Sequence, residues 1–437
     1  MAKPTIFIPG FPASTLRDAT TKEQLFPPTS LGADIPAILA KLIKIPGVEA
    51  GPPILDTIPF FAPAASTLYA ILAGHGISEA NGNFIPIGWD WRQSVASDDT
   101  VGRIKTAVDT LTPKGKIVAV IHSTGGLVFR AFLQKNPDYI DRFEQVLAFA
   151  IPWLGTLEAL HAVDKGTPIK IVFKTILSTE QSLELLTRCQ AAYDLFPSDP
   201  PTSLYTLNGN PSSPLIDRSW LDPNRPYMPG HCDDAYPQTN AFPTLPVTNI
   251  CGWGGPTWPQ CDSDGNGNLT FGNPINEPGD GTVQFVSASS LQGGNVRSMF
   301  LPIGAFVDFA TPKVHGQIWD PPIVGQLVNE VFDNAAKKPF VTAAVDSNDF
   351  VNQNATHPRV RVAATAADGS PLPNAKVTFG TGPLAQTVSL QGQKKIDLDL
   401  ARGIFDQKPA PTIARTVVTV SWDGGQPVKI PIAIMTS

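Results

Sequence analysis

Charged side chains are scarce in this chain of 437 residues: they account for 16%, against about 25% in an average soluble protein. No cluster of lysine and arginine occurs and the net charge is −6, so nothing could neutralise a phosphate backbone and we expect no nucleic-acid partner. Long uninterrupted apolar runs are missing too. The most apolar stretch, residues 52–74, contains Asp56 and several prolines, which argues against a bilayer-spanning helix of about 20 residues.

Cysteine is sparse as well, and the chain contains only Cys189, Cys232, Cys251 and Cys261. Their spacing does not match a zinc site. A segment rich in glycine, proline and tryptophan separates Cys251 from Cys261, and a disulfide would restrain it. This is the first candidate pair, and Cys189 with Cys232 is the second. Bridged cysteines would favour a secreted or periplasmic protein.

The start of the chain bears on the same question. Met1-Ala2-Lys3-Pro4 leads directly into the strand-like Thr5–Ile8, without the charged, apolar and cleavage regions of a signal peptide. We therefore expect either a cytoplasmic protein or one whose leader was removed before residue 1.

Two hydrophobic periodicities divide the chain. Up to about residue 335, short apolar runs alternate with amphipathic segments of helix length, which is typical of a parallel sheet covered by helices. The predicted strands are residues 5–8, 84–87, 116–121, 145–151 and 247–250. After about Lys338 the period changes to two, and Asp423-Gly424-Gly425 supplies a hairpin turn, so we expect a small immunoglobulin-like β-sandwich. The predicted domains are residues 1–338 and 339–437.

Several segments of the first domain have open interpretations. Residues 195–280 are mostly loop by composition, and a loop region that long is usually functional. The apolar residues 54–70 and the region 156–250 predict a lid over a substrate, or the core of a cap domain. Asp262-Ser263-Asp264-Gly265-Asn266-Gly267 matches half of a calcium-binding loop, but Asn273 replaces the required glutamate. We interpret it as an acidic surface turn and expect no metal.

The segment that carries chemistry is residues 116–130, in which an apolar strand turns into a helix at Ser123. This layout exposes a serine hydroxyl at the sheet edge, while the N–H of Thr124 and the helix N-terminus face the position of an oxyanion. Gly125 and Gly126 allow the helix to pack closely behind the turn. An ordinary strand-to-helix connection is the alternative interpretation.

A nucleophilic serine needs a base and an acid, which in this layout follow it along the chain as aspartate or glutamate and then histidine. Of the six histidines, His122 adjoins the serine and is expected to point elsewhere. After the serine and before the sandwich, His161, His231 and His315 remain, and His315 lies in a loop before the last predicted helix of the domain. Asp280, flanked by glycines at a strand end, is the candidate acid. The chain order favours Ser123, Asp280 and His315.

Five segments in order resemble the lecithin:cholesterol acyltransferase-like lipases and phospholipid acyltransferases of the α/β-hydrolase superfamily. They are residues 8–14, Trp89-Asp90-Trp91-Arg92, His122-Ser123-Thr124-Gly125-Gly126, Pro152-Trp153-Leu154-Gly155-Thr156 and Gly279-Asp280-Gly281-Thr282-Val283. The resemblance covers about residues 4–335. It implies an α/β-hydrolase fold, Ser123 as nucleophile, Asp280 as acid and His315 as base, and the N–H groups of Phe11 and Thr124 as the oxyanion hole.

Two positions depart from the family pattern. Ile121 replaces the first glycine of the nucleophile motif, so we expect the elbow to be packed differently, and Thr124 stands where methionine is frequent. We expect Asp90 and Arg92 to hold their loop by an ion pair rather than to act in catalysis.

The resemblance implies a serine esterase, lipase or acyltransferase that acts on lipid-like acyl esters without a cofactor. Hydrolysis is favoured over transfer, because no residue in the sequence demonstrates that water is excluded. The alternative is a surface- or polymer-binding adhesion protein whose hydrolase domain is a relic. In either case the lid or the sandwich could contact a lipid or polymer surface, and the sequence does not indicate an oligomeric state.

Overall fold

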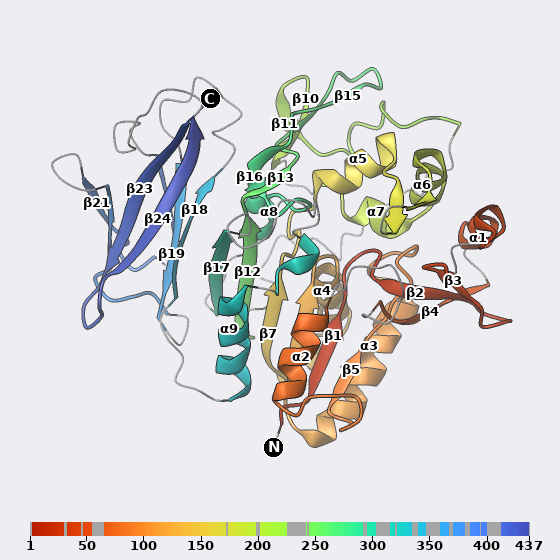
Figure 1. Ribbon diagram of the computed structural model, residues 1–437, viewed down its shortest axis with the longest axis horizontal. Helices are drawn as coiled ribbons and strands as arrows, with labels where there is room; N and C mark the ends of the chain where they lie inside the picture. Colours follow the sequence, from red (N-terminus) through yellow and green to blue (C-terminus); the bar gives the residue numbers. More distant parts are fainter. Residues whose placement is uncertain are drawn as a thin grey trace.

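The computed structural model describes residues 2–29, 33–44, 47–54, 65–171, 174–197, 202–224, 242, 244–291, 295–302, 315–319, 321–333, 340–346, 359–366, 370–380, 385–393, 395–399 and 412–436. Six strands form a central parallel sheet in the order β17-β12-β7-β6-β1-β5 (Figure 1). Their bounds are β1 (Thr5–Ile8), β5 (Phe84–Pro86), β6 (Ile117–His122), β7 (Phe143–Phe149), β12 (Val247–Trp253) and β17 (Val296–Pro302). The five predicted strands all lie in this sheet, and β17, at its edge, was not predicted.

Helices cover both faces of the sheet, because side chains alternate between the two faces along each buried strand. Ile6 and Ile8 of β1 join the apolar cluster that contains α3 (Asp98–Leu111) and α4 (Gly125–Lys135). Phe7 joins the cluster on the opposite face, with α2 (Ser66–Gly74) and α9 (Pro322–Phe332).

The segment 54–70, which the sequence offered as part of a lid, lies partly in α2. Ala65 and Leu68 are buried in the apolar cluster on one face of the sheet, whereas Ala70 is exposed. Residues 55–64 lie outside the described residues.

Beyond the carboxyl ends of the strands lie α5 (Leu157–Lys165), α6 (Thr179–Leu186) and α7 (Gln190–Asp194) (Figure 1). Four apolar residues of the lid candidate 156–250 are buried here: Leu183, Leu185, Leu186 and Phe196. The remaining elements of this region are β2 (Ser14–Asp18), β3 (Gln24–Phe26), α1 (Ile35–Leu42), β4 (Val48–Pro53), β8 (Ile169–Ile171) and β9 (Lys174–Leu177). At the opposite edge of the sheet, η1 (Thr112–Lys114) precedes β6 and η2 (Pro137–Arg142) precedes β7.

The described part of residues 195–280, which were predicted to be mostly loop by composition, contains several short strands between its loops. Besides β12, a sheet in the order β11-β10-β14-β15 and the pair β13-β16 lie within it. Their bounds are β10 (Thr202–Leu207), β11 (Asn210–Ser212), β13 (Gly255–Thr257), β14 (Cys261–Ser263), β15 (Leu269–Phe271) and β16 (Ile275–Gly279). These strands are short and interrupted by turn residues, so they show little period-two alternation.

The predicted disulfide between Cys251 and Cys261 is wrong, since both residues are thiols. Cys251 lies on β12 of the central sheet and its Sγ donates to the carbonyl of Ala288, 3.3 Å away, whereas Cys261 lies on β14 of a different sheet. Cys189 is a thiol as well and donates to the carbonyl of Leu185, and Cys232 lies outside the described residues. Burial raises the pKa of the Cys189 and Cys261 thiols.

Two antiparallel sheets follow, as the period-two pattern predicts (Figure 1). One has the order β18-β19-β22 and the other β21-β20-β23-β24. Their strands are β18 (Phe340–Asp346), β19 (Arg359–Thr365), β20 (Lys376–Phe379), β21 (Gln386–Ser389), β22 (Lys395–Asp399), β23 (Thr412–Ser421) and β24 (Val428–Thr436). Val360, Val362, Val377 and Phe379 belong to one apolar cluster between the sheets. No helix among the described residues is long and apolar enough to cross a membrane.

Candidate active site

Ser123 occupies a sharp turn between β6 and α4. Its φ of 52° lies in the left-handed region, which non-glycine residues rarely adopt and which marks strained functional turns. Its N–H donates to the carbonyl of Phe149 on β7 at 2.9 Å, so the turn is tied to the neighbouring strand. The side chain is 7% exposed. A serine on a strained turn between a strand and a helix is the geometry that a nucleophile elbow requires.

Three glycines allow the chain to pack closely around this turn. A Cβ added to Gly10 would lie 2.6 Å from Cβ of Ser123, and one added to Gly125 would lie 2.3 Å from the carbonyl oxygen of Ile8. A Cβ on Gly126 would lie 2.3 Å from the side chain of Ile151. Ile121 itself is fully buried within β6. Glycine is therefore needed on the loop and helix that face the serine, and not at position 121.

The loop after β1 lies against Ser123. The N–H of Ala13 donates to the carbonyl of Gly10 at 2.9 Å, which closes a tight turn around Phe11. Among the described residues, neither the N–H of Phe11 nor that of Thr124 has a hydrogen-bond acceptor. Two such donors beside a serine, one of them at the start of a helix, can receive a developing oxyanion.

The Trp89-Asp90-Trp91-Arg92 segment supports the loop after β1 through hydrogen bonds and ring packing. The indole N–H groups of Trp89 and Trp91 donate to the carbonyls of Pro9 and Ser14, both at 3.0 Å. The ring of Trp91 also packs edge-on against Phe11, with centroids 5.3 Å apart. The segment therefore buttresses the loop that carries the candidate oxyanion donor.

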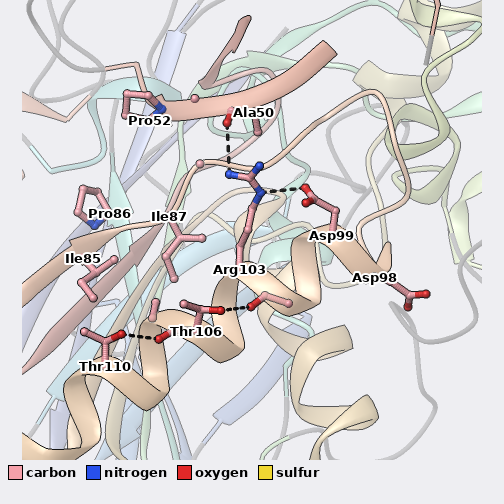
Figure 2. A pocket seen from close by; sticks show the side chains of 14 residues that line it. Ala50, Pro52, Ile85, Pro86, Ile87, Asp98, Asp99, Arg103, Thr106 and Thr110 are labelled. Atoms are coloured by element: carbon pink, nitrogen blue, oxygen red, sulfur yellow. Dashed lines mark hydrogen bonds and ion pairs between the residues drawn. The ribbon is translucent and has the colours of Figure 1, made fainter. Parts of the chain in front are cut away.

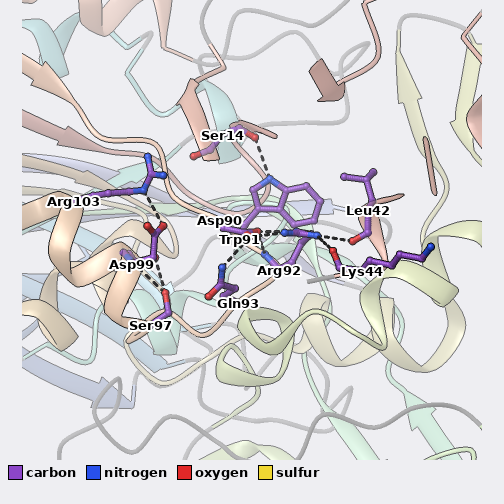
Figure 3. Close-up of polar contacts among 11 residues, drawn as sticks. Ser14, Leu42, Lys44, Asp90, Trp91, Arg92, Gln93, Ser97, Asp99 and Arg103 are labelled. Atoms are coloured by element: carbon purple, nitrogen blue, oxygen red, sulfur yellow. Dashed lines mark hydrogen bonds and ion pairs between the residues drawn. The ribbon is translucent and has the colours of Figure 1, made fainter. Parts of the chain in front are cut away.

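Asp90 and Arg92 form a buried two-pronged ion pair, drawn in Figure 3, with N–O distances of 2.8 and 2.6 Å. Their side chains are 2% and 1% exposed. The remaining guanidinium nitrogen donates to the carbonyls of Leu42 and Lys44, at 2.8 and 2.9 Å. This arrangement joins the end of α1 to residues 89–92, which lie behind the loop after β1. The ion pair therefore has a structural role.

Asp280 lies at the end of β16 and is fully buried. Its Oδ1 accepts the N–H groups of Thr282 and Val283, at 3.1 and 2.8 Å, which orients the carboxylate. Its Oδ2 accepts from Nδ1 of His315 at 2.7 Å. The turn allows this because Gly281 takes a φ of 91°.

His315 begins η4 (His315–Gln317), directly before α9. Because the carboxylate of Asp280 can only accept, Nδ1 carries a proton and Nε2 is the nitrogen with the free lone pair. In the described part of the chain, this buried Nε2 has no hydrogen-bond partner. A buried nitrogen without a partner is unusual for a structural histidine and is what a general base needs before its substrate arrives.

The other histidines of the sequence argument differ in their surroundings. His161 lies on α5 and stacks on Trp258, with ring centroids 4.8 Å apart, and burial lowers its pKa. His231 lies outside the described residues. Of His161 and His315, the two of these candidates that the structure describes, only His315 contacts Asp280.

His122 does not point away from the site, contrary to the sequence-based expectation. Its Nε2 lies 3.3 Å from the carbonyl oxygen of His315, and the two rings lie 4.9 Å apart. The ring centroids of Trp319 and His122 lie 4.5 Å apart. Nε1 of Trp319 also donates to the carbonyl of Gly316 at 3.1 Å. Burial, and then the positive charge of a protonated His315, hold the pKa of His122 well below its usual value. Chain order carried no signal for these contacts, because they join segments that are far apart in sequence.

Part of the chain matches a known protein family. Residues 65–215 match the family model of lecithin:cholesterol acyltransferase. The predicted family resemblance is confirmed. The matched segment contains Trp89-Asp90-Trp91-Arg92 and Ser123, whereas Asp280 and His315 follow it along the chain. The match supports an acyl hydrolase or acyltransferase of lipid-like esters.

No curated protein sequence matches the chain. Among solved structures, the Tle4–Tli4 complex is similar with 14% identity and a TM-score of 0.50, over 75% of this chain and 97% of that one. Bacillus licheniformis lipase BlEst2 in its propeptide form is 10% identical over 99% and 93% of the two chains, with a TM-score of 0.33. Phospholipase PlaB from Legionella pneumophila is 11% identical over 99% and 90%, with a TM-score of 0.28. The parallel sheet with helices on both faces confirms the α/β-hydrolase fold, and the antiparallel sheets that follow it form a β-sandwich.

An acidic loop and a surface groove lie apart from these residues. In the acidic loop, Oδ1 of Asp264 accepts the N–H groups of Asn266 and Asn268, at 2.7 and 3.2 Å, so the loop satisfies its own carboxylate. Among the described residues, no group of three or more potential metal ligands occurs. A surface groove of about 770 Å³ lies between β4, β5 and α3 (Figure 2). Its Arg103 is already paired with Asp99 at 2.8 Å and bonded to the carbonyl of Ala50.

Proposed function

We propose that the protein is a serine esterase or lipase that cleaves acyl groups from lipid-like esters through an acyl-enzyme on Ser123. The observation that carries the proposal is the 2.7 Å bond between Nδ1 of His315 and Oδ2 of Asp280. It joins the two residues that chain order selects as base and acid. It also leaves Nε2 of His315 as the lone pair available to a serine hydroxyl.

In the proposed reaction, Oγ of Ser123 attacks the ester carbonyl while Nε2 of His315 takes the serine proton. Asp280 holds the imidazole in the required tautomer and stabilises the imidazolium that forms. The N–H groups of Phe11 and Thr124 donate to the oxyanion of the tetrahedral intermediate. The alcohol leaves with the proton from His315, and an acyl group remains on Ser123.

The second half of the catalytic cycle removes the acyl group. His315 takes a proton from water, the resulting hydroxide attacks the acyl-enzyme, and the carboxylic acid leaves as Oγ of Ser123 is reprotonated. An acceptor alcohol in place of water would give acyl transfer. We favour hydrolysis, because transfer requires a site that excludes water from the acyl-enzyme. The chemistry needs neither a metal nor a cofactor.

The proposal extends to the domains. We assign catalysis to residues 1–338, with the cap in 156–250 contributing to a lid over a lipid-like substrate, and we treat residues 339–437 as a second domain. A surface- or polymer-binding protein with an inactive hydrolase domain is disfavoured, because an inactive site would need neither a strained serine nor an oriented histidine–aspartate pair.

The test combines covalent labelling with substitution. A fluorophosphonate should label the full-length protein once, at Ser123, and Ser123→Ala should lose activity on a short-chain chromogenic ester by roughly 10⁶-fold while keeping its unfolding temperature. Label recovered on another serine would remove the proposal.

The base is tested separately. His315→Ala should abolish turnover, while His161→Ala and His231→Ala retain it. Substrates of increasing acyl-chain length, assayed with and without an acceptor alcohol, then distinguish esterase, lipase and acyltransferase.

A further inference from the structure

The β-sandwich contacts the domain of the proposed active site through a buried face. In β19, Val360, Val362 and Ala364 belong to the sandwich's own core. Ala363 points the opposite way and is only 1% exposed. The outer face of a sandwich sheet normally meets water. Its burial at Ala363 therefore means that another part of the molecule covers it.

The covering part is the region around the turn that carries Asp280. Ala363 joins an apolar cluster whose other members all come from the first domain. They are Cys251, Trp253, Val283, Phe285, Ala288 and Phe300. Figure 1 shows β18 beside β17, the edge strand of the central sheet. The cluster is separate from the sandwich core, so it forms the junction between the domains.

Polar contacts fix the position of this junction. Nη1 of Arg361, which shares its face of β19 with Ala363, donates to Oγ of Ser289 at the end of α8 (Phe285–Ala288). The guanidinium carbon of Arg361 also lies 5.8 Å from the ring centroid of Phe285. Thr342, the cross-strand partner of Ala363, accepts the N–H of Phe300 at 3.2 Å.

One member of this cluster is hydrogen-bonded to Asp280, the proposed acid. Val283, which is 1% exposed within it, donates its N–H to Oδ1 of Asp280 at 2.8 Å and accepts the N–H of Asp280 at 3.2 Å. Phe285, two residues further on, packs edge-on against Phe300 at 4.9 Å. The junction thus packs against the same short turn that contacts His315 through Asp280.

We propose that the β-sandwich is a positioning element for catalysis: Ala363 and Arg361 seat the turn 280–289 so that Asp280 keeps its geometry towards His315. This inference goes beyond the proposed function and rests on the role assigned there to Asp280. It differs from an independent docking module, which would leave the active site unaffected by changes at the junction.

The test uses full-length point variants and a soluble short-chain ester. Ala363→Leu adds three carbons where the cluster is closed, and Arg361→Ala removes the contacts to Ser289 and Phe285. Because a misplacement of about 1 Å can cost about 100-fold in rate, we expect kcat to fall by about 10-fold in each variant with KM unchanged. Arg361→Lys, which keeps a cation and a donor, should recover part of the loss.

A control separates positioning from general stability. Val377→Ala truncates a fully buried residue in the opposite sheet of the sandwich, so it lowers the unfolding temperature without touching the junction. Titration of active sites by the fluorophosphonate burst gives the number of competent molecules. A positioning role lowers the rate per competent site in the junction variants but not in Val377→Ala.

The outcomes are distinguishable. Asp280→Asn with full activity would remove the proposed function and this inference together. If Asp280→Asn loses activity while both junction variants keep the rate per site of the unmodified protein, the inference alone is overturned. If Ala363→Leu does not fold, Arg361→Ala decides, because it removes volume rather than adding it.

Discussion

The Nε2 atom of His122 lies 3.3 Å from the backbone carbonyl oxygen of His315. A carbonyl oxygen can only accept, so Nε2 of His122 carries the proton and donates it. The residue directly before the proposed nucleophile therefore contacts the turn that carries the proposed base. Trp319 donates to the next carbonyl, that of Gly316, so two ring N–H groups hold consecutive carbonyls of one short turn.

The first prediction is that His122 acts on the position of His315. His122→Phe keeps an aromatic ring but loses the donor, and one lost hydrogen bond of about 1 kcal/mol corresponds to a rate lower by about 5- to 10-fold. The loss should appear in kcat and not in KM. His122→Gln, which can donate from a similar place, should recover part of it. An unchanged kcat in His122→Phe would show that the contact has no role in turnover.

The second prediction concerns stability at acidic pH. The folded protein holds the pKa of His122 well below 6.5, so the unfolded chain binds a proton that the folded one does not. The contribution of neutral His122 is complete above pH 6.5 and declines as the pH falls below it, by at most about 1.4 kcal/mol per pH unit. Urea unfolding at pH 7 and pH 5 should show a smaller decline for His122→Asn. His161, whose pKa is also lowered, is present in both proteins and does not affect the difference.

The sequence predicted the fold where one local signal was sufficient. Apolar runs identified five strands of the central sheet, and alternation identified the sandwich. The turn at Ser123 was visible because an apolar strand, a serine and two glycines follow each other directly. Chain order selected Asp280 and His315 as candidates, because no local signal could predict a contact that spans 35 residues.

The misses have a common physical cause. The disulfide between Cys251 and Cys261 was inferred from loop composition, but Cys251 belongs to β12, whose seven residues are all buried. The contact of His122 with His315 spans 193 residues, and that of Arg361 with Ser289 spans 72. Such contacts depend on which elements meet in space, and neither composition nor periodicity contains that information.

The third prediction compares two arginines in unlike surroundings. Arg92 pairs with Asp90 in the interior, where their side chains are 1% and 2% exposed (Figure 3). Arg103 pairs with Asp99 near the surface, where their side chains are 35% and 48% exposed (Figure 2). Lysine cannot reproduce a two-pronged contact. Arg92→Lys should therefore lower the free energy of unfolding by about 3 kcal/mol, and Arg103→Lys by less than about 1 kcal/mol. Equal losses in urea unfolding would mean that burial of the Asp90 pair does not determine its contribution.

The last prediction concerns Gly10, which faces Ser123, the proposed nucleophile. A Cβ at this position would lie 2.6 Å from Cβ and 3.0 Å from Oγ of Ser123, closer than real contacts allow, so Gly10→Ala must displace the serine or the oxyanion loop. Because the proposed reaction depends on both, kcat should fall by about 100-fold or more.

Gly102, inside α3, is the matched control for this change. A Cβ there would meet nothing within 4 Å, so Gly102→Ala should leave kcat unchanged and raise the stability by about 0.5–1 kcal/mol. Esterase assays and urea unfolding of both variants separate the two effects. If Gly10→Ala retained full activity, the close approach of the oxyanion loop to Ser123 could not be a requirement of the reaction.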